Sequence, residues 1–381
     1  MRRLAAGIAP LLLASSLVHA APPAPPVQDN KSWIVVDFDS GRVLGEGNSH
    51  QRLAPASMTK MMTSYLVEQG LNSGRLKETD PVYVSEYAWC RGTSAESCMY
   101  LPVHGQASVI DMLRGIIIQS GNDASKAMAE HIGGSEPAFA ELMNKEAARL
   151  GMKDTVFKNA TGMPDPAHLT TAYDLAILAR AIIRDSAHYY PIYAEKEFTY
   201  NRIKQGNRNA LLYTDPSVDG LKTGHTDDAG YCLTASAKRD GMRLISVVMG
   251  TKSMQARADQ TRALFNWGFA NFENVKPVTA GTVLATPRVW FGKADSVKAG
   301  LASDLNLTLA RGEKDRLKTE LQLDPEVRAP LAKGQAIGKV NVLLDGQVVA
   351  TQPVVALEAV EEANFFARLW QHIALFFSKI F

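Results

Sequence analysis

The order of hydrophobic patterns along the chain constrains its fold most strongly. A β-branched run and a glycine-containing turn predict a β-hairpin over residues 32–47. Two further strand-like runs, 231–238 and 243–249, are joined by the turn residues Arg239-Asp240-Gly241. Because strands stand at both ends of a helix-rich segment, the sequence predicts one α+β domain, in which the N-terminal hairpin completes an antiparallel sheet with the late strands. Apolar residues at helical spacing predict the helices 58–69, which Gly70 ends, 109–119, 123–132, 137–150, 173–184 and 256–272.

The length of the chain predicts a second folded unit. With 381 residues it exceeds the size of a typical single domain. We place the first domain at residues 32–274. Over residues 275–360 short apolar runs alternate with glycine and charged turns, and Asp345-Gly346 between two β-prone runs is a strong hairpin signal. This region is predicted to be a small all-β domain, and none of its residues suggests a chemical role.

The first twenty residues have the pattern of a cleaved signal peptide. The basic start Met1-Arg2-Arg3 is followed by a mostly apolar stretch and by Val18-His19-Ala20, which ends in a small residue. A retained membrane anchor is the alternative, but the apolar run is shorter than the roughly 20 residues that a bilayer span needs. A Pro-rich segment follows at residues 21–31. We therefore expect residues 1–20 to be removed and the mature protein to be exported to a compartment in which disulfides persist.

The chain contains three cysteines, whose pairing matters because disulfides persist in such a compartment. Cys90 and Cys98 flank a short polar loop and can form a disulfide. Two free thiols are the alternative, because the sequence does not show whether the Cα atoms come within bridging distance. Cys232 lies in an apolar run and is expected to be a small buried residue rather than a reactive thiol.

The last segment, residues 361–381, is predicted to be an amphipathic helix that attaches the protein to a membrane surface. Its aromatic face suits the acyl chains of a bilayer interface, and the basic residues opposite suit lipid phosphates. Packing on the protein's own core is the alternative, although such a dense aromatic face at a chain end would otherwise stay exposed. The apolar face comprises Phe365, Phe366, Leu369, Trp370, Ile373, Phe376, Phe377 and Ile380. The opposite face carries Asn364, Arg368, Gln371, His372, Ser378 and Lys379, and Leu375 is the one clear violation.

Charge and histidine spacing exclude several function classes. The net charge of +2 lacks the clustered basic excess typical of nucleic-acid binding. A hydrophobic content of 46% with 21% charged residues is that of a soluble globular protein rather than a polytopic membrane protein. The eight histidines show no H-E-x-x-H or comparable spacing, so a metallopeptidase is not implied. We expect neither a metal nor another cofactor.

Three short motifs in the first domain suggest its chemistry. They are Ser57-Met58-Thr59-Lys60, Ser120-Gly121-Asn122 and Lys222-Thr223-Gly224, and each is the only match to its pattern in the chain. A Ser-x-x-Lys pattern alone is weak, since most matches are surface helix positions. The combination is far more specific.

Ser57 and Lys60 are the predicted nucleophile and base. Residues three apart on a helix share a face, so the amine can reach the hydroxyl. Ser57 is expected at the helix start, where free N–H groups and the helix dipole favour negative charge, and its own N–H can serve an oxyanion. Lys60 can accept a proton only when neutral, a state favoured by burial and by a second cation, for which Lys222 is the candidate. An ordinary helix cap with a solvated lysine is the alternative.

The other two motifs are expected to complete the site. The Ser120 hydroxyl can relay a proton between the two lysines and the leaving group, and the Asn122 amide can orient Lys60 or the substrate. A simple turn in which Asn122-Asp123 caps the next helix is the alternative, and both roles can hold together. Lys222-Thr223-Gly224 is expected on a strand whose edge pairs with an extended substrate. There Gly224 permits close approach, Lys222 and Thr223 meet a terminal carboxylate, and the His225 N–H is the second oxyanion donor.

In their order and separations these motifs resemble those of the penicillin-binding protein and serine β-lactamase superfamily. More narrowly, the whole chain resembles the low-molecular-mass D-alanyl-D-alanine carboxypeptidases. The resemblance implies a serine β-lactamase or DD-peptidase-like catalytic domain with an acyl-enzyme on Ser57, Lys60 as proton acceptor, Ser120 in proton relay and Lys222 in substrate binding. It further implies a peripheral protein on the periplasmic face of the inner membrane, with peptidoglycan stem peptides as substrate and β-lactams as covalent inhibitors.

Two arginines and the cysteine loop are less firmly placed by this resemblance. Arg208 and Arg257 are implied to hold the substrate carboxylate, and a surface or structural salt bridge is the alternative for both. Cys90 and Cys98 lie outside the core family pattern. The loop they enclose immediately precedes residues 99–101, beside the expected site, and its effect on substrate choice is open.

The expected reaction is acyl transfer in two steps. Ser57 attacks the carbonyl of the penultimate D-alanine, the terminal D-alanine leaves, and water releases the shortened peptide. A β-lactamase is one alternative, but no Glu-containing segment before Lys222 can be assigned as its deacylation base. An endopeptidase that cuts peptidoglycan cross-links has the same chemistry and is poorly separated by sequence. A non-catalytic peptidoglycan-binding protein or a structural envelope protein would not need the intact motif residues.

Overall fold

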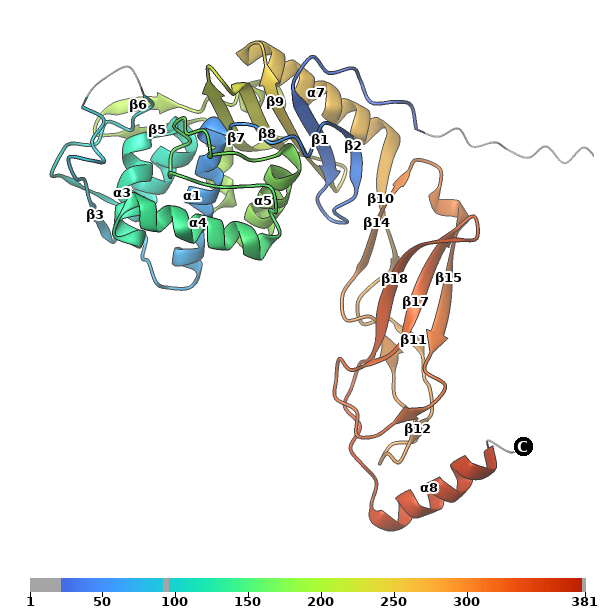
Figure 1. Ribbon diagram of the computed structural model, residues 1–381. Coiled ribbons are helices and arrows are strands. Elements are labelled where there is room, and N and C mark those ends of the chain that lie inside the picture. Colours follow the sequence, from blue (N-terminus) through green and yellow to red (C-terminus); the bar gives the residue numbers. More distant parts are fainter. Residues whose placement is uncertain (1–21, 92–95, 379–381) are drawn as a thin grey trace, which may run out of the picture.

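The structure is a computed structural model that describes residues 22–91 and 96–378. The expected signal peptide, residues 1–20, and the end of the expected terminal helix, residues 379–381, lie outside the described residues. Two domains and a terminal helix follow one another along an elongated molecule (Figure 1).

The first domain is built around a five-stranded antiparallel sheet with the strand order β2-β1-β9-β8-β7. The N-terminal hairpin pairs through β1 with β9, which confirms that it completes the sheet with the late strands. Asp240 and Gly241, which join β8 to β9, have φ of 48° and 84°, as a tight hairpin turn requires. The strands are β1 (Ser32–Asp37), β2 (Val43–Gly47), β7 (Val218–Thr226), β8 (Gly230–Arg239) and β9 (Met242–Thr251).

Helices cover both faces of this sheet (Figure 1). Side chains alternate along β1, so Ile34 belongs to the same hydrophobic cluster as Leu178 of α5, whereas Val35 clusters with Phe265 of α7. The helices and helical turns of this domain are η1 (Ala56–Thr59), α1 (Lys60–Asn72), α2 (Val109–Arg114), η2 (Gly115–Gln119), α3 (Asn122–Gly133), α4 (Glu136–Leu150), α5 (Ala172–Asp185), η3 (Tyr190–Ala194), α6 (Leu211–Thr214) and α7 (Met254–Asn271). Two small hairpins lie outside the sheet, β3 (Pro81–Tyr83) with β4 (Gln106–Ser108) and β5 (Glu197–Tyr200) with β6 (Ile203–Gly206).

The expected end of the first helix at Gly70 is wrong. α1 continues through Gly70 to Asn72. A Cβ atom at Gly70 would lie 2.6 Å from Cδ1 of Leu76, so the glycine serves close packing against the following segment rather than termination. The chain turns instead at Gly74, whose φ is +71°.

The second domain is all-β, with its own apolar core. β10 pairs with β14, β12 with β16, and the other strands form a sheet with the order β11-β13-β18-β17-β15. Asp345 and Gly346 have φ of 52° and 82° and join β17 to β18, which confirms the predicted hairpin. The strands are β10 (Phe272–Val278), β11 (Val283–Ala285), β12 (Val289–Trp290), β13 (Ala299–Gly300), β14 (Leu305–Ala310), β15 (Leu317–Leu323), β16 (Val327–Arg328), β17 (Ala336–Leu344) and β18 (Gln347–Ala356).

Hydrogen bonds join the two domains beside the β1–β2 turn and at the end of α7. Arg42, which follows the β1–β2 turn, donates to the carbonyl of Thr308 at 2.6 Å. Arg311 donates to the carbonyl of Phe269, at the end of α7, at 2.8 Å. The second domain is thereby attached beside α7, away from the helical layer that contains α1 and α3 (Figure 1).

The terminal helix α8 (Phe365–Ser378) docks on the far end of the second domain (Figure 1). Leu375 is buried against Trp290 and Phe291, so it is not a violation of the amphipathic pattern but the centre of the docking face. Gln371 accepts a hydrogen bond from the Phe291 N–H, and the ring of His372 lies 4.2 Å from that of Phe291. Two residues of the polar face thus contact the second domain.

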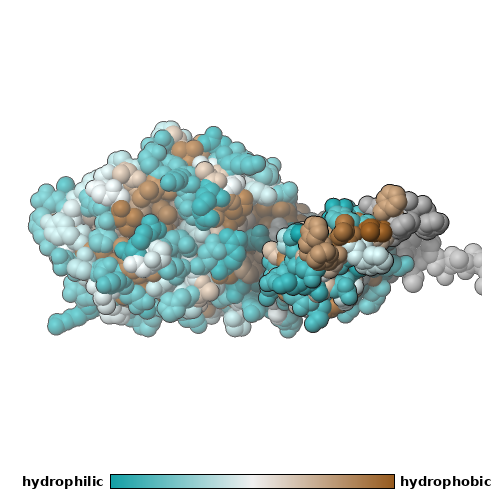
Figure 2. Space-filling model, turned by 90° about the horizontal axis from the view of Figure 1, so that it is seen from below, coloured by the Kyte–Doolittle hydropathy of each residue, from teal (hydrophilic) through white to brown (hydrophobic). Residues whose placement is uncertain are grey.

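The aromatic face of α8 stays exposed. Phe366 is 81% exposed and Trp370 is 70% exposed. Figure 2, which looks onto this end of the molecule, shows hydrophobic side chains gathered along the helix. Among the described residues, no helix is both long and apolar enough to cross a bilayer.

Candidate active site

The motif residues meet at one cavity of about 940 Å³. It lies between the turn that precedes α1, the start of α3 and the outer strand β7. The motif lysines Lys60 and Lys222 lie behind its wall, with exposed fractions of 0% and 3%. Among the residues singled out from the sequence, those that line the cavity are Ser57, Ser120, Asn122, Arg208, Thr223, Gly224, His225 and Arg257.

Lys60 is held in a geometry suited to accepting a proton from Ser57. Its Nζ atom lies 3.1 Å from Ser57 Oγ, 2.7 Å from Asn122 Oδ1 and 2.6 Å from the Thr161 carbonyl oxygen. The amide oxygen and the carbonyl oxygen can only accept hydrogen bonds. A neutral amine therefore gives its two N–H groups to these oxygens and keeps its lone pair for the Ser57 hydroxyl.

Burial is the main reason why this amine can be neutral. It lowers the pKa of Lys60 from 10.5 to about 7, with the charge of Arg208 as the next cause. The expected second cation, Lys222, interacts electrostatically with Lys60. It is itself buried, and burial together with the charge of Lys60 holds its own pKa well below the ordinary value.

Ser120 and Lys222 form a second hydroxyl–amine pair in the site. Lys222 Nζ donates to Ser120 Oγ and to the Thr223 carbonyl, both at 3.0 Å. Ser120 has a left-handed backbone with φ of 65°, at the junction of the π-helical turn η2 and α3. Such a conformation is strained for a residue with a side chain and is typical of functional sites.

Asn122 is the first residue of α3, but its side chain does not cap that helix. Its Oδ1 accepts from Lys60 at 2.7 Å and its Nδ2 donates to Glu96 at 2.8 Å. The neighbouring Asp123 accepts from the backbone N–H groups of Met99 and Leu101, and from that of Ala124 in the first turn of α3. The oxygen of the Asn122 side chain therefore binds Lys60 instead of capping the helix.

Gly224 allows β7 to lie against the turn that holds Ser57. A Cβ atom there would be 2.9 Å from the Pro55 carbonyl oxygen and 3.2 Å from Cγ of Met58. β7 is an outer strand, paired only with β8 in the sheet. Its unpaired edge can therefore receive an extended peptide next to the serine hydroxyl.

The two arginines occupy different positions in the cavity wall. Arg257 is 5% exposed and donates to the carbonyls of Gly224, at 3.2 Å, and Cys232, at 3.4 Å, which ties it to the strands. Arg208 is exposed and lines the cavity. Both guanidinium groups add positive charge on the side of the cavity formed by β7.

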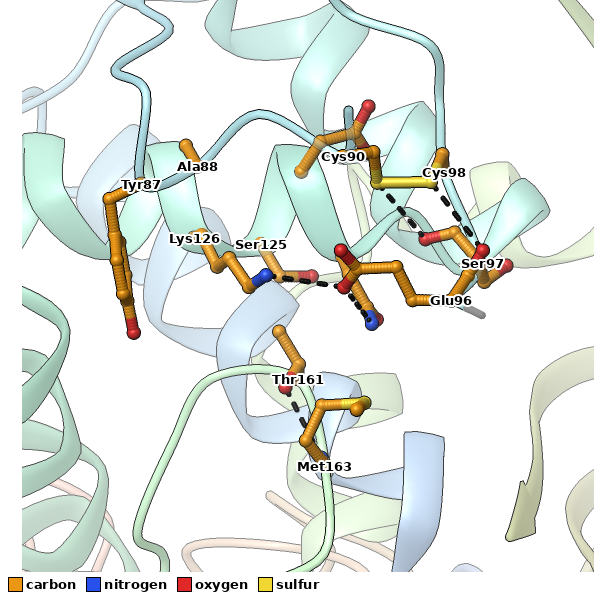
Figure 3. Close-up of polar contacts among 12 residues, drawn as sticks. Tyr87, Ala88, Cys90, Glu96, Ser97, Cys98, Ser125, Lys126, Thr161 and Met163 are labelled. Atoms are coloured by element: carbon orange, nitrogen blue, oxygen red, sulfur yellow. Dashed lines mark hydrogen bonds and ion pairs between the residues drawn. A yellow bond between two sulfur atoms is a disulfide. The ribbon is translucent and has the colours of Figure 1, made fainter. Parts of the chain in front are cut away.

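Sequence reasoning missed Thr161 and Glu96, because both come from segments without a motif. Thr161 supplies its backbone carbonyl to Lys60, and the adjoining Gly162 has φ of +84° and packs so closely that a Cβ atom would lie 1.8 Å from the Ala56 carbonyl oxygen. Glu96 accepts from Asn122 and forms an ion pair with Lys126 at 3.2 Å (Figure 3). The only sequence signal for Glu96 is its place two residues before Cys98.

Cys90 and Cys98 are joined by a disulfide beside this ion pair (Figure 3). Their Cα atoms are 6.2 Å apart, which is the distance that the sequence alone left open. Cys232 is buried, as expected for a small core residue.

Comparison with known proteins agrees with this geometry. The family model described as D-alanyl-D-alanine carboxypeptidase matches residues 19–253, and the model of the penicillin-binding protein 5 C-terminal domain matches residues 272–362. The chain is 42% identical to D-alanyl-D-alanine carboxypeptidase DacC of Escherichia coli K12 over 388 residues, which covers 100% of this chain and 97% of the relative. It is 44% identical to DacA of Haemophilus influenzae over 360 residues, which covers 94% and 92% of the two chains.

Solved structures extend this similarity to the fold. The crystal structure of penicillin-binding protein 5 from Haemophilus influenzae superimposes with a TM-score of 0.84 at 45% identity, over 89% of this chain and 100% of that one. Penicillin-binding protein 6B from Escherichia coli superimposes with a TM-score of 0.74 at 37% identity, over 88% and 98% of the two chains. The match of the family model and the full-length relatives together show that the chain belongs to the D-alanyl-D-alanine carboxypeptidase family.

Proposed function

We propose that the protein is a serine-type D-alanyl-D-alanine carboxypeptidase that removes the terminal D-alanine from peptidoglycan pentapeptide stems through an acyl-enzyme on Ser57. The observation that carries this proposal is the buried amine of Lys60, 3.1 Å from Ser57 Oγ, with both of its N–H groups given to fixed acceptors. The same nucleophile would be acylated by β-lactams, which act as covalent inhibitors.

The first step of the proposed reaction is formation of the acyl-enzyme. Lys60 takes the proton of the Ser57 hydroxyl as Oγ attacks the carbonyl carbon of the penultimate D-alanine. The resulting oxyanion is stabilised by the backbone N–H groups of Ser57 and His225. The C–N bond then breaks, and the departing amine of the terminal D-alanine takes a proton that passes from Lys60 by way of Ser120 and Lys222.

In the second step water hydrolyses the ester. Lys60, neutral again, takes a proton from the attacking water, and the tetrahedral intermediate collapses to the free peptide carboxylate. The Ser57 oxygen regains a proton from Lys60, which completes the cycle without a metal or cofactor in the proposal.

The positive wall of the cavity favours carboxypeptidase over endopeptidase action. A free C-terminal carboxylate would lie near Arg208, Lys222 and Thr223, whose guanidinium, amine and hydroxyl groups can donate hydrogen bonds to an anion. An endopeptidase substrate has a longer chain at this position and needs no such charge. The two relatives compared above are also named as carboxypeptidases.

A pair of substrates tests this proposal. Intact mass spectrometry of a synthetic pentapeptide ending in D-Ala-D-Ala is expected to show loss of one alanine, while a cross-linked peptide dimer is cleaved much more slowly. Penicillin is expected to add to the protein as one covalent adduct that Ser57→Ala abolishes. An adduct that survives this substitution, or a pentapeptide that stays intact, would remove the proposal.

We also propose that the protein is exported, after cleavage of residues 1–20, and works on the periplasmic face of the inner membrane. Residues 32–274 would be the catalytic domain and residues 275–360 a spacer that carries it at a distance from the lipid. The exposed aromatic face of α8 supports membrane attachment, because a helix that docks by Leu375 presents those rings away from the protein.

A further inference from the structure

A short segment at the end of the disulfide loop, residues 96–99, contacts the turn between η2 and α3. The Ser97 carbonyl accepts a hydrogen bond from the Asn122 backbone N–H at 2.7 Å, and the Ser97 hydroxyl donates to the Gln119 carbonyl at 2.8 Å. The Met99 N–H donates to Asp123 at 2.8 Å. The disulfide at Cys98 ties the same segment to Cys90 (Figure 3). The segment is therefore fixed against the part of the chain that carries Ser120 and Asn122.

Because this segment is fixed, the Glu96 side chain lies in contact with the side chain of Asn122. One carboxylate oxygen, Oε2, accepts both from Asn122 Nδ2 at 2.8 Å and from Lys126 Nζ at 3.2 Å. The side chains of Glu96 and Lys126 are each 16% exposed, so water competes little for either contact. Glu96 also lines the cavity wall.

The chemistry of these groups determines which way the Asn122 amide points. An amide has acceptor lone pairs on its oxygen and two donors on its nitrogen, whereas a carboxylate only accepts. Glu96 therefore holds Nδ2 on its own side and leaves Oδ1 to Lys60. If the amide turned over, its N–H groups would face the lysine and draw the amine lone pair away from the Ser57 hydroxyl.

We propose that Glu96 is a positioning residue of the acylation step, which acts through Asn122 to keep the Lys60 lone pair directed at Ser57, and that the Cys90–Cys98 disulfide holds it in place. This inference rests on the proposed roles of Ser57 and Lys60. It concerns a residue that belongs to none of the three motifs.

The negative charge of Glu96 has a second, opposing effect. It raises the pKa of Lys60, against the effect of burial. Replacing the carboxylate by an amide of the same shape thus separates positioning from charge. Besides Glu96, the charged and titratable groups that bear on Lys60 are Arg208, Asp123, Lys126, Lys222 and His168.

The test compares Glu96→Gln and Glu96→Ala with the matched changes Glu141→Gln and Glu141→Ala on the exposed surface of α4. The rate of Ser57 acylation by a fluorescent penicillin is measured across pH with the full chain. The Gln variant retains an oxygen that can accept from both Asn122 and Lys126. Its plateau rate at high pH is expected to stay near that of the unchanged protein. The pH at which the rate reaches half of this plateau is expected to fall, because loss of the negative charge lowers the pKa of Lys60.

The Ala variant removes the acceptor for Asn122. Its plateau rate is expected to fall about tenfold, as for the loss of a charge-assisted hydrogen bond. The pH of its half-plateau rate is also expected to fall. In an Asn122→Ala background, Glu96→Ala is expected to have almost no further effect on the plateau, because the two residues act in series. The Glu141 variants are expected to match the unchanged protein.

Three results would overturn the proposal: a Glu96→Ala plateau equal to that of the unchanged protein, a Glu96→Gln plateau that falls as far as that of Glu96→Ala, or an equal loss from Glu96→Ala with and without Asn122. If Glu96→Ala fails to fold, as judged by its thermal transition, Glu96→Met, which also lacks an acceptor for Asn122, replaces it in each comparison. An unchanged protein that is not acylated at all would instead remove the proposed function, so the two failures are distinguishable.

Discussion

The Lys60 amine lies 3.1 Å from the Ser57 hydroxyl and makes its two other hydrogen bonds to oxygens that cannot donate. The lysine is therefore fixed by groups from three separated segments, which meet only in the folded domain. Its reactivity depends on that convergence as much as on the Ser-x-x-Lys spacing.

Replacing the base tests its role directly. Lys60→Met keeps a long apolar stem but removes the amine, and we expect acylation by penicillin to fall by about 10²- to 10⁴-fold, the usual contribution of a general base. Stopped-flow fluorescence and intact mass measure the rate and the extent. Lys153→Met, at an exposed position, should leave both unchanged. A Lys60→Met protein that acylates at the normal rate would contradict the assignment.

The close approach of β7 to the nucleophile requires a glycine. In Gly224→Ala the new Cβ would lie 2.9 Å from the Pro55 carbonyl oxygen, so strand and turn must separate. We expect a loss of about 1–3 kcal/mol in unfolding free energy and a fall of roughly tenfold to a hundredfold in acylation. The control Gly206→Ala has its nearest neighbour, Tyr213 Oη, at 3.7 Å. Equal activity of the two variants would show that this contact is unimportant.

Buried Glu68 predicts a pH-dependent stability. Burial raises its pKa from 4.5 to about 8, so the folded protein favours the neutral acid while the unfolded chain ionises. The resulting loss of stability develops as pH rises from 4.5 to about 8 and is complete above that range. Glu68→Gln, which cannot ionise, should therefore be more stable than the unchanged protein at pH 9, on the order of 4 kcal/mol.

The same substitution should bring no such gain at pH 4, where both states of Glu68 are largely protonated. Urea unfolding at the two pH values measures the difference, with Glu141→Gln as the exposed control. A gain that is equal at both pH values would attribute the effect to packing rather than to ionisation.

The exposed rings of α8 predict vesicle binding. We expect the double change Phe366→Glu and Trp370→Glu to abolish co-sedimentation with vesicles that contain anionic lipid, since it places two charges where apolar surface meets acyl chains. The matched change Val348→Glu and Val349→Glu also alters two exposed apolar residues, on β18, and should leave binding intact. Binding that survives the α8 change would refute attachment through this face.

Short sequence patterns predicted the features whose structure is determined by residues that are close together in the sequence. The N-terminal hairpin, the tight turn at Asp240-Gly241 and the strand that carries Lys222 follow from turn residues and β-prone runs. Ser57 and Lys60 could be paired because three residues on a helical segment span a fixed distance.

Other features depend on contacts between distant segments and could not be read from pattern. Gly70 was expected to end a helix, but packing against Leu76 outweighs the local preference of glycine. A helical wheel showed two faces of α8 but not that Leu375 would meet Phe291. Glu96 contacts Asn122 across 26 positions of sequence, and no motif points to it.

The pH dependence of Ser57 acylation tests the central claim most directly. With Lys60 at a pKa of about 7, the second-order rate constant for reaction of the free protein with penicillin should rise with pH and reach half its plateau near pH 7, as the ammonium loses its proton. A half-plateau near the ordinary lysine value of 10.5, or a rate that does not change with pH, would contradict a neutral lysine base.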